Sequence, residues 1–369
     1  QDDARSLALC GSCCGASIWC SCTGWSNPVA HRARIPDIAT NSARTWNRRA
    51  LPTKHAQMQA CTVMAPAAEA PIDQREKMDR VAQEYYDSDD IFNYYQQVWG
   101  EEYIHVGLYT KFQGEDKKLK GVQRIAKASS ISTQELLSLC FPAGDGSLAP
   151  EKCVLVDMGA GFGGTARVAA KEYGCDVICI NISKRQNDLN ISLNKAAGLE
   201  GKISVPGEKS FFDTGLPDSS CDVVCSQDAF SHAGPERYKA LAEASRLLKS
   251  GGRLVFTDFM QTEEADDKDL EVVCKPHGMD NMATLSSYQQ CGKDHGLEVV
   301  EFADLIENFG MHYTALMEVL EAEGKNLKGV RQEFVAKTLA GLTAWKTASD
   351  RGLMSWGIIV LQKPVGSKL

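Results

Sequence analysis

An apolar run that ends in a glycine-rich turn constrains the fold of this chain more than any other segment. Residues 154–158 read Val-Leu-Val-Asp-Met, and Gly159, Gly161, Gly163 and Gly164 follow them. The run predicts a strand buried on both faces, and the glycines permit a tight turn whose backbone N–H groups can approach a ligand. The spacing matches neither the dinucleotide-binding Gly-x-Gly-x-x-Gly nor a P-loop, since no Lys-Ser or Lys-Thr follows. We therefore expect a nucleotide-type ligand without a pyrophosphate, such as an adenosine that carries a methionine tail.

The rest of the chain continues the strand and helix pattern of an α/β fold. A second apolar run covers 176–180, and Ser183 can cap a helix over 186–193. Further strands are expected at 203–205, 221–232 (with a polar tip), 253–258, 297–302 and 354–361. A helix is expected over 235–249, ended by Gly251 and Gly252. Helical insertions are expected over 262–294 and 304–350. About seven strands with helical crossovers predict a doubly wound sheet. Ligands lie beyond the carboxyl ends of such strands, so the glycine-rich turn and Asn181 should share one site.

The first 64 residues differ in composition from the rest. Residues 1–60 hold six Arg and one Lys against three Asp and no Glu, with a cysteine cluster between Cys10 and Cys22. No second cysteine or histidine pair follows at zinc-finger spacing, so no metal is expected. We expect a disordered leader, a transit peptide or a non-native upstream segment over 1–64, a helical cap over 65–130 and the α/β domain over 131–369. The protein is then cytoplasmic, or plastid-targeted if the leader is a genuine transit peptide.

Charge and hydropathy limit the partners. The formal net charge is −8 at pH 7, and no apolar run has the length of a membrane span. The excess of acidic over basic residues, with no stripe of basic residues, argues against a surface that binds nucleic acid. A small-molecule substrate, and possible assembly into a homodimer, fit these limits.

A block rich in aromatic residues precedes the glycine-rich turn. Six of the fifteen residues 85–99 are aromatic, against 8% in the whole chain. On a helix, Tyr95 and Trp99 share a face. Such rings can simply pack the helix onto the sheet. They can also hold an alkylammonium group through its charge, at about 0.5 to 2 kcal/mol for each ring.

Seven motifs occur in order along the chain and together carry a family resemblance. They are Tyr-Tyr-Asp-Ser-Asp-Asp (85–90), Val-Trp-Gly (98–100), Ile-His-Val-Gly-Leu-Tyr (104–109), Asp-x-Gly-Ala-Gly-x-Gly-Gly (157–164), Asn-Ile-Ser-x-x-Gln-Asn (181–187), Ser-Gln-Asp-Ala-Phe-x-His (226–232) and Ser-Trp-Gly (355–357). Over about residues 81–363 the chain resembles the sarcosine/dimethylglycine N-methyltransferases, which belong to the class I S-adenosylmethionine-dependent methyltransferases. Weaker versions of the motifs resemble phosphoethanolamine, tocopherol and sterol methyltransferases and cyclopropane fatty acid synthases.

The resemblance implies a Rossmann-like seven-stranded class I methyltransferase sheet with an N-terminal helical cap and helical insertions. It implies S-adenosylmethionine as the cofactor, and methylation of sarcosine and dimethylglycine toward glycine betaine. The attacking amine must be neutral, although a free aliphatic amine resembles Lys with a pKa of about 10.4. Desolvation among aromatic rings favours the neutral form, and a nearby His can take the proton.

Specific residues are expected to form the site. Cofactor binding is assigned to Asp157, Gly159, Ala160, Gly161, Asn181, Ile182, Gln186, Ser210, Phe211, Gln227 and Asp228. Catalysis is assigned to His105, Tyr94 and His232, and substrate binding to Tyr86, Trp99 and Trp356. Asp228 and His232 would face one another if the strand tip turns helical. Neither Arg167 nor Arg185 is assigned as the partner of a substrate carboxylate.

Two alternatives remain open. The acceptor could instead be phosphoethanolamine, a sterol or prenyl ring, or a thioether acid, because related methyltransferases share the weaker motifs. The chain could also be a cofactor-binding protein without catalytic activity.

Overall fold

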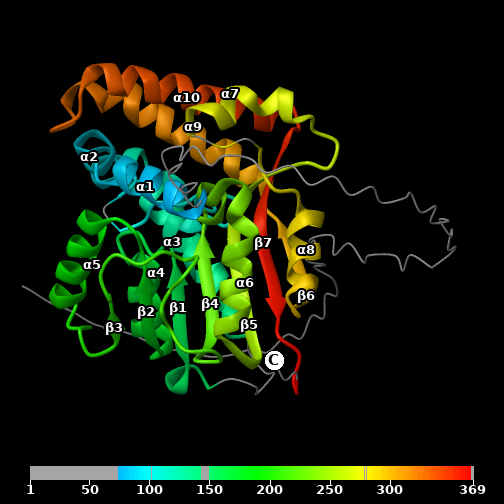
Figure 1. The fold of residues 1–369 in the computed structure, drawn as a ribbon. Coiled ribbons are helices and arrows are strands. Elements are labelled where there is room, and N and C mark those ends of the chain that lie inside the picture. The colour runs from blue at the N-terminus through cyan, green and yellow to red at the C-terminus, as the bar shows by residue number, and fades with distance from the viewer. Residues whose placement is uncertain (1–73, 101, 143–148, 278, 280, 367–369) are drawn as a thin grey trace, which may run out of the picture. The chain divides into compact units, whose positions relative to one another are not determined.

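A seven-stranded sheet forms the centre of the computed structural model, which describes residues 74–100, 102–142, 149–277, 279 and 281–366 (Figure 1). The predicted leader lies outside the described residues. The strands are β1 (Val154–Met158), β2 (Asp176–Ile180), β3 (Ile203–Ser204), β4 (Cys221–Gln227), β5 (Leu248–Gln261), β6 (Glu298–Asp304) and β7 (Met354–Gln362). Their order is β3-β2-β1-β4-β5-β7-β6, with β7 antiparallel to both neighbours and β1 to β5 parallel. The predicted Rossmann-like sheet is confirmed.

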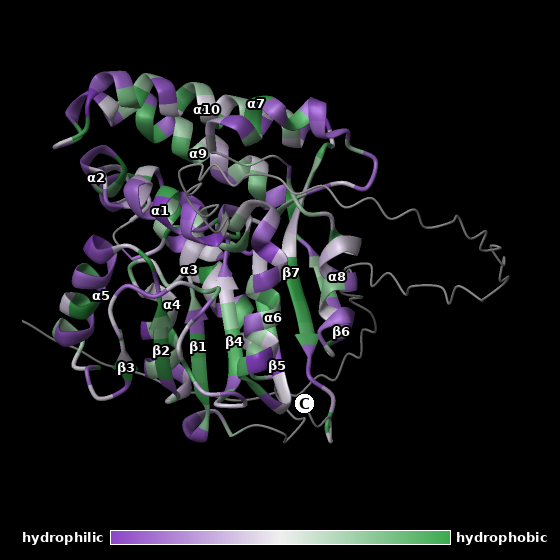
Figure 2. Ribbon diagram, in the orientation of Figure 1, coloured by the Kyte–Doolittle hydropathy of each residue, from purple (hydrophilic) through white to green (hydrophobic). Residues whose placement is uncertain are grey.

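Side-chain alternation explains how the sheet packs on both faces. Leu155 joins one hydrophobic cluster, whereas the adjacent Val156 joins the other, because successive strand residues point to opposite faces. The Leu155 face is covered by α3 (Gly121–Cys140) and α4 (Gly164–Val168), and the opposite face by α6 (Arg237–Leu247) and α8 (Leu285–Asp294). Figure 2 shows the central strands β4 and β7 as mainly hydrophobic, as expected for strands buried on both faces, whereas the edge strand β6 is only partly buried.

A second group of helices lies over the end of the sheet at which the parallel strands finish (Figure 1). These helices are α1 (Gln74–Tyr86), α2 (Asp89–Val98), α7 (Glu271–Cys274), α9 (Ile306–Glu323) and α10 (Gln332–Asp350). All of them except α1 share a hydrophobic cluster with α3 and with the start of β7. Met78 of α1 packs instead against the cluster that contains α6 and α8. The predicted helical insertions therefore exist, and they cover the edge where ligands bind in α/β sheets. The domain boundary predicted at residue 130 falls inside α3.

Polar contacts attach this group of helices to the ligand-binding end of the sheet. Between α1 and α2, Asp87 accepts a hydrogen bond of 2.5 Å from the hydroxyl of Ser183. Ser183 is also the N-cap of α5 (Lys184–Ala196), as the sequence predicts. From α9, Asn308 accepts hydrogen bonds from the backbone N–H groups of Tyr109 (2.8 Å) and Thr110 (3.0 Å). Residues far apart in the chain thus fix the segments beside the strand tips.

The structure corrects two predicted elements. The strand expected over 221–232 ends at Gln227, and a short helix begins at Phe230. The helix expected over 235–249 begins at Arg237 and ends at Leu247. Pro235 lies in the preceding short helix Phe230–Glu236, which is kinked at Gly234, where φ is 53°. Gly251 and Gly252 do not end the helix: they lie within β5, which begins at Leu248, where its backbone pairs with Cys221.

Among the described residues, no helix is both long enough and apolar enough to cross a lipid bilayer.

Candidate active site

The glycine-rich turn after β1 packs tightly against its neighbours. Gly159 and Gly161 have φ of 80° and 53°, which residues with a Cβ rarely adopt. A Cβ on Gly159 would lie 2.4 Å from the Cβ of Ala229, just after β4. The backbone N–H groups of Gly159 and Ala160 both donate to the carbonyl of Ile180, at the end of β2. The turn is therefore held between the tips of β2 and β4, where the sequence predicts a ligand.

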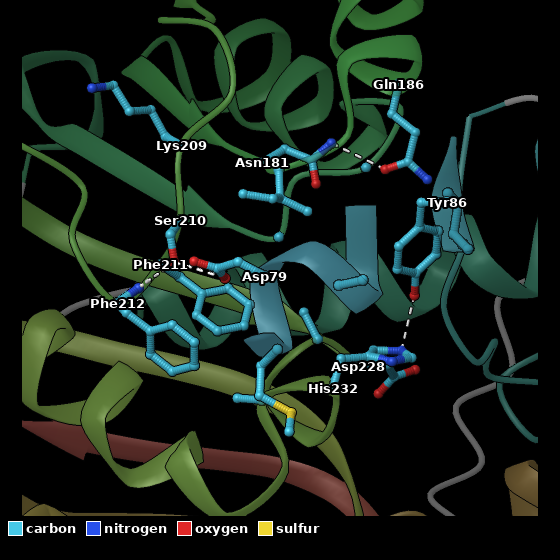
Figure 3. Close-up of a pocket in the computed structure, with 18 of the residues that line it drawn as sticks. Asp79, Tyr86, Asn181, Gln186, Lys209, Ser210, Phe211, Phe212, Asp228 and His232 are labelled. Carbon is cyan, nitrogen blue, oxygen red and sulfur yellow. Dashed lines mark hydrogen bonds between the residues drawn. The ribbon is translucent and has the colours of Figure 1, made fainter. Parts of the chain in front are cut away.

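A cleft of about 670 Å³ opens beside this turn. Its walls come from α1, the glycine-rich turn, the β2 tip, the segment 209–212 and the β4 tip, as Figure 3 shows for the labelled residues. Nine of the eleven residues predicted to bind the cofactor line it: Gly159, Gly161, Asn181, Ile182, Gln186, Ser210, Phe211, Gln227 and Asp228. Tyr86 and His232, predicted for substrate binding and catalysis, line it as well.

Three side-chain hydrogen bonds link elements around the cleft (Figure 3). The amide of Asn181 donates to Gln186 at 3.0 Å. Ser210 donates to the Asp79 carboxylate at 3.0 Å, which joins α1 to the opposite wall. The hydroxyl of Tyr86 lies 2.9 Å from Nε2 of His232. The cleft walls are thus preorganised by contacts between distant parts of the chain.

A smaller cleft of about 320 Å³ continues on the other side of the turn. It shares Gly159, Gly161 and Gln227 with the larger cleft, and it contains the two remaining predicted cofactor residues, Asp157 and Ala160. Burial raises the pKa of Asp157 to about 7, and a weak contact from the Cys225 thiol opposes this rise. Among the described residues, Oδ2 of Asp157 has no hydrogen-bond partner. A buried carboxylate oxygen that lacks a donor suits a cationic ligand group.

Asp228, at the tip of β4, is held by three donors. It has φ of 53°, and its carboxylate accepts from the backbone N–H of Val106 (2.8 Å), the hydroxyl of Thr257 (2.7 Å) and the indole N–H of Trp356 (2.8 Å). Burial nevertheless raises its pKa, although these donors oppose the rise. Asp228 does not cap the helix that follows, since the N-cap is Ala229. Trp356, predicted to bind substrate, is fully buried and contacts the site through Asp228.

His105 lines the smaller cleft as a neutral residue. Burial lowers its pKa to about 4. Its Nε2 lies 3.1 Å from the Thr133 hydroxyl. Its Nδ1 lies 3.2 Å from the carbonyl oxygen of Val106 and 3.3 Å from the side-chain amide nitrogen of Gln227. This arrangement orients Gln227 in the cleft, and it makes His105 a weaker candidate than His232 for accepting a proton.

The aromatic block packs as a connected group. The rings of Tyr86 and Tyr95 are 6.1 Å apart, and those of Tyr95 and Trp99 are 5.3 Å apart. Of this group only Tyr86 lines the larger cleft; Tyr94 and Trp99 are 4% and 6% exposed within the hydrophobic cluster. The block therefore extends from the cleft wall into the layer of helices above the sheet.

Several residues near the site were not predicted. Met78 and Asp79 of α1 line the larger cleft, and His312 of α9 contacts the aromatic block. None belongs to a motif, and only the four-residue spacing of Asn308 and His312 on one helix face could have suggested a shared partner.

Other candidates lie away from the clefts. Met260 is buried in the sheet core, and Arg167 is buried against the carbonyl of Phe162. Arg185 donates to the backbone carbonyl of Asp87, outside the cleft.

Comparisons with known proteins agree with this geometry. A family model described as "Methyltransferase domain" matches residues 156–256. The sarcosine/dimethylglycine N-methyltransferase of Halorhodospira halochloris is 35% identical over 283 residues, which are 76% of this chain and 95% of that protein. The glycine/sarcosine/dimethylglycine N-methyltransferase of Actinopolyspora halophila is 37% identical over 78% of this chain, which spans only about half (48%) of that relative. The crystal structure described as a "putative sarcosine dimethylglycine methyltransferase" from Galdieria sulphuraria has a TM-score of 0.68 and 29% identity, and the match covers 76% of this chain and 99% of that one.

Proposed function

Since this chain belongs to the sarcosine/dimethylglycine N-methyltransferase family, we propose that it is an S-adenosylmethionine-dependent enzyme that methylates sarcosine and dimethylglycine to glycine betaine. The observation that carries the proposal is the position of Tyr86. Its ring lines the nucleotide-type cleft and begins the aromatic group that continues through Tyr95 to Trp99. An amine acceptor beside that ring would meet the methyl donor directly.

The residues around the two clefts fit S-adenosylmethionine. The larger cleft offers Asn181 for ribose hydroxyls, and Ser210 and Phe211 for the adenine. The smaller cleft offers the unpaired oxygen of Asp157 for the ammonium of the methionine part. Because the clefts share Gly159, Gly161 and Gln227, one extended ligand can lie in both. When bound, the cofactor would supply a methyl group on a sulfonium, which a neutral nitrogen would attack in line at the methyl carbon while the sulfur leaves as a neutral thioether.

The side chains beside Asp228 can prepare the acceptor nitrogen. Burial raises the pKa of Tyr86 well above its usual value, so its hydroxyl stays protonated and can only relay a proton. The hydroxyl oxygen accepts the proton of the ammonium while the Tyr86 proton moves to Nε2 of His232, 2.9 Å away. The amine lone pair is then free to attack. The surrounding rings exclude water and position the nitrogen, and neither role requires a covalent intermediate.

Other acceptors are tested by one experiment. The purified full-length protein is incubated with S-adenosylmethionine labelled in the methyl group and with sarcosine, dimethylglycine, phosphoethanolamine, a prenyl quinol or a thioether acid. We expect label in dimethylglycine and betaine. Transfer only to an acceptor other than a glycine derivative would refute the proposal, and cofactor binding without any transfer would indicate a catalytically inactive protein.

A matched pair of glycine variants shows whether transfer depends on this site. Gly159→Ala adds a Cβ at positive φ and 2.4 Å from Ala229, so it should abolish transfer. Gly341→Ala adds a Cβ on α10 with no atom within 4 Å, so it should leave transfer unchanged.

The predictions about cellular location and oligomeric assembly are based on the amino-acid composition of the chain. A cytoplasmic or plastid location, a possible homodimer and the lack of nucleic-acid binding are inferred from the charge and the leader. Fractionation and the mass of the protein in solution test them.

A further inference from the structure

Three buried polar atoms at the inner end of the aromatic block have no hydrogen-bond partner among the described residues. They are the hydroxyl of Tyr94, Nε1 of Trp99 and Nε2 of His312. Their side chains are 4%, 6% and 0% exposed. The rings of Trp99 and His312 are 4.7 Å apart. The Trp99 indole acts on the Tyr94 hydroxyl as a weak donor, which opposes the rise in the Tyr94 pKa that burial causes, but no hydrogen bond of normal length joins the two. Unpaired buried polar groups are rare in proteins, and three of them together require an explanation.

All three atoms can act as hydrogen-bond donors. Nδ1 of His312 accepts from the backbone N–H of Gly107 at 3.2 Å and lies 2.9 Å from the Tyr109 hydroxyl. Burial lowers the His312 pKa to about 3, so the ring is neutral and its single proton must be on Nε2. An indole nitrogen can only donate, and a Tyr hydroxyl can donate. The cluster is therefore a set of donors that lack an acceptor.

The donors lie close to the cleft that we assign to the methyl donor. The Tyr95 ring is in contact with Tyr86, which lines that cleft, on one side and with Trp99 on the other. The backbone gives a second connection, because the consecutive N–H groups of residues 106 and 107 donate to Asp228 and His312 respectively. Asp228 itself lines the cleft. The donors are thus connected to the cleft wall through the Tyr95 ring and through the backbone of residues 106 and 107.

We propose that Tyr94, Trp99 and His312 bind the carboxylate of the amino-acid acceptor while its nitrogen lies beside Tyr86. This inference rests on the proposed function and names the carboxylate partner that the sequence did not reveal. Neutral donors suit a substrate whose charges sum to zero. A phosphate group would favour Arg or Lys at the contact, and none of the three donors is cationic.

The test compares two acceptors that differ in the carboxylate. Dimethylglycine and N,N-dimethylethylamine carry the same kind of tertiary amine, but only the first is an acid. Binding of each to the full-length protein loaded with S-adenosylhomocysteine is measured by calorimetry, together with KM and kcat for methyl transfer. Trp99→Phe and Tyr94→Phe remove one donor each and keep the ring. We expect each variant to raise Kd and KM for dimethylglycine about tenfold to a hundredfold, with unchanged binding of the amine.

A matched tryptophan controls for general effects on packing. Trp345 lies in the same hydrophobic cluster and is 5% exposed, close to the 6% of Trp99. Trp345→Phe should leave the selectivity for the carboxylate unchanged. His312 offers a rescue: His312→Gln can place an N–H near the position of Nε2, whereas His312→Asn replaces mainly Nδ1, so the Gln variant should bind dimethylglycine more tightly than the Asn variant.

The results distinguish failure of the carboxylate site from failure of the proposed function. Suppose that the native protein methylates dimethylglycine, and that melting curves show both Trp99→Phe and Tyr94→Phe to be folded. If both variants then bind dimethylglycine with a Kd within twofold of the native value, the carboxylate site is refuted and the proposed function stands. If Trp99→Phe does not fold, Tyr94→Phe, which removes a single oxygen, decides the question. Methyl transfer restricted to acceptors without a carboxylate would refute the proposed function itself.

Discussion

Single buried acids set the electrostatics of the site. Burial raises the pKa values of both Asp157 and Asp258 to about 7, and it raises the pKa of Asp228 as well. Hydrogen-bond donors partly stabilise the ionised forms of two of these acids: the Tyr288 hydroxyl donates to Asp258, and three donors contact Asp228. Asp157 has only the weak Cys225 contact. Ionisation of Asp157 therefore lowers the stability of the ligand-free protein, and we expect a cationic ligand to restore it.

Replacing Asp157 by Asn should change stability and binding in opposite directions. The native pKa of about 7 lies above the unfolded value near 3.8, so the ionised carboxylate destabilises the fold most above pH 7. At about 1.4 kcal/mol for each pH unit between these two pKa values, the ionised carboxylate costs at most about 4 kcal/mol of stability. In the free protein, Asp157→Asn should raise the melting temperature at pH 8, and the gain should shrink as the pH falls from 7 to 4.

The same substitution should weaken binding of S-adenosylhomocysteine about tenfold, because an amide lacks the charge that attracts an ammonium. Melting curves at several pH values and calorimetry provide the two measurements. A variant that is less stable at pH 8, or one that binds as tightly as the native protein, would contradict the role given to Asp157.

His232 offers a second prediction at this scale. His232→Gln can keep a hydrogen bond to Tyr86 but cannot take up a proton at neutral pH. We expect kcat for dimethylglycine to fall about a hundredfold, as for loss of a general base. The variant's rate should keep rising with pH toward the amine pKa of about 10, whereas the native rate levels off earlier. Equal pH profiles would show that His232 only positions Tyr86.

The sequence predicted site residues where chemistry and local pattern coincide. Gly159 and Asn181 follow buried strands, and parallel strands bring their carboxyl ends to one edge, so their proximity could be deduced. His312 could not be deduced, because its role depends on α9 crossing the segment after Ile104, about two hundred residues earlier. Asp79 likewise reaches the cleft only because α1 lies against the segment that contains Ser210.

At the scale of elements, the strand count was more predictable than the strand order. Apolar runs bounded by turns gave seven strands, but nothing in their spacing indicates that β7 inserts between β5 and β6 in the antiparallel direction. That insertion has a consequence for the site. It brings Trp356 beside Phe259 of β5, and from there the indole N–H reaches Asp228 at the β4 tip.

Helix α1 should respond to the ligand more than any other described element. None of residues 75–86 is fully buried, yet Met78, Asp79, Ala82 and Tyr86 line the larger cleft. The free helix should therefore open readily, since few buried contacts protect it. We expect S-adenosylhomocysteine to slow hydrogen exchange of its backbone amides markedly, with little change in the exposed part of α10. Equal exchange with and without ligand would show that α1 does not close the cleft.

At the scale of the whole described chain, the proposed cofactor and acceptor sites use different parts of one unit. The clefts proposed for the cofactor are built mainly from the sheet tips between Asp157 and Ala233, with α1 added. The proposed acceptor side is built from the segment 94–109 together with α9 and β7. Residues 74–366 belong to one compact unit, so ligand contacts on the sheet should stabilise the helices above it as well.

This coupling predicts a single melting transition that depends on ligand concentration. At a hundred times its Kd, a ligand specific for the native state adds about 2.7 kcal/mol of stability. With about 2 to 4 °C for each kcal/mol in domains of this size range, S-adenosylhomocysteine should raise the melting temperature by about 5 to 10 °C. Gly159→Ala should lose the shift, whereas Gly341→Ala should keep it. Two transitions, of which only one moves with ligand, would instead mean that the helices above the sheet unfold independently, and the acceptor side would then have to assemble anew in each catalytic cycle.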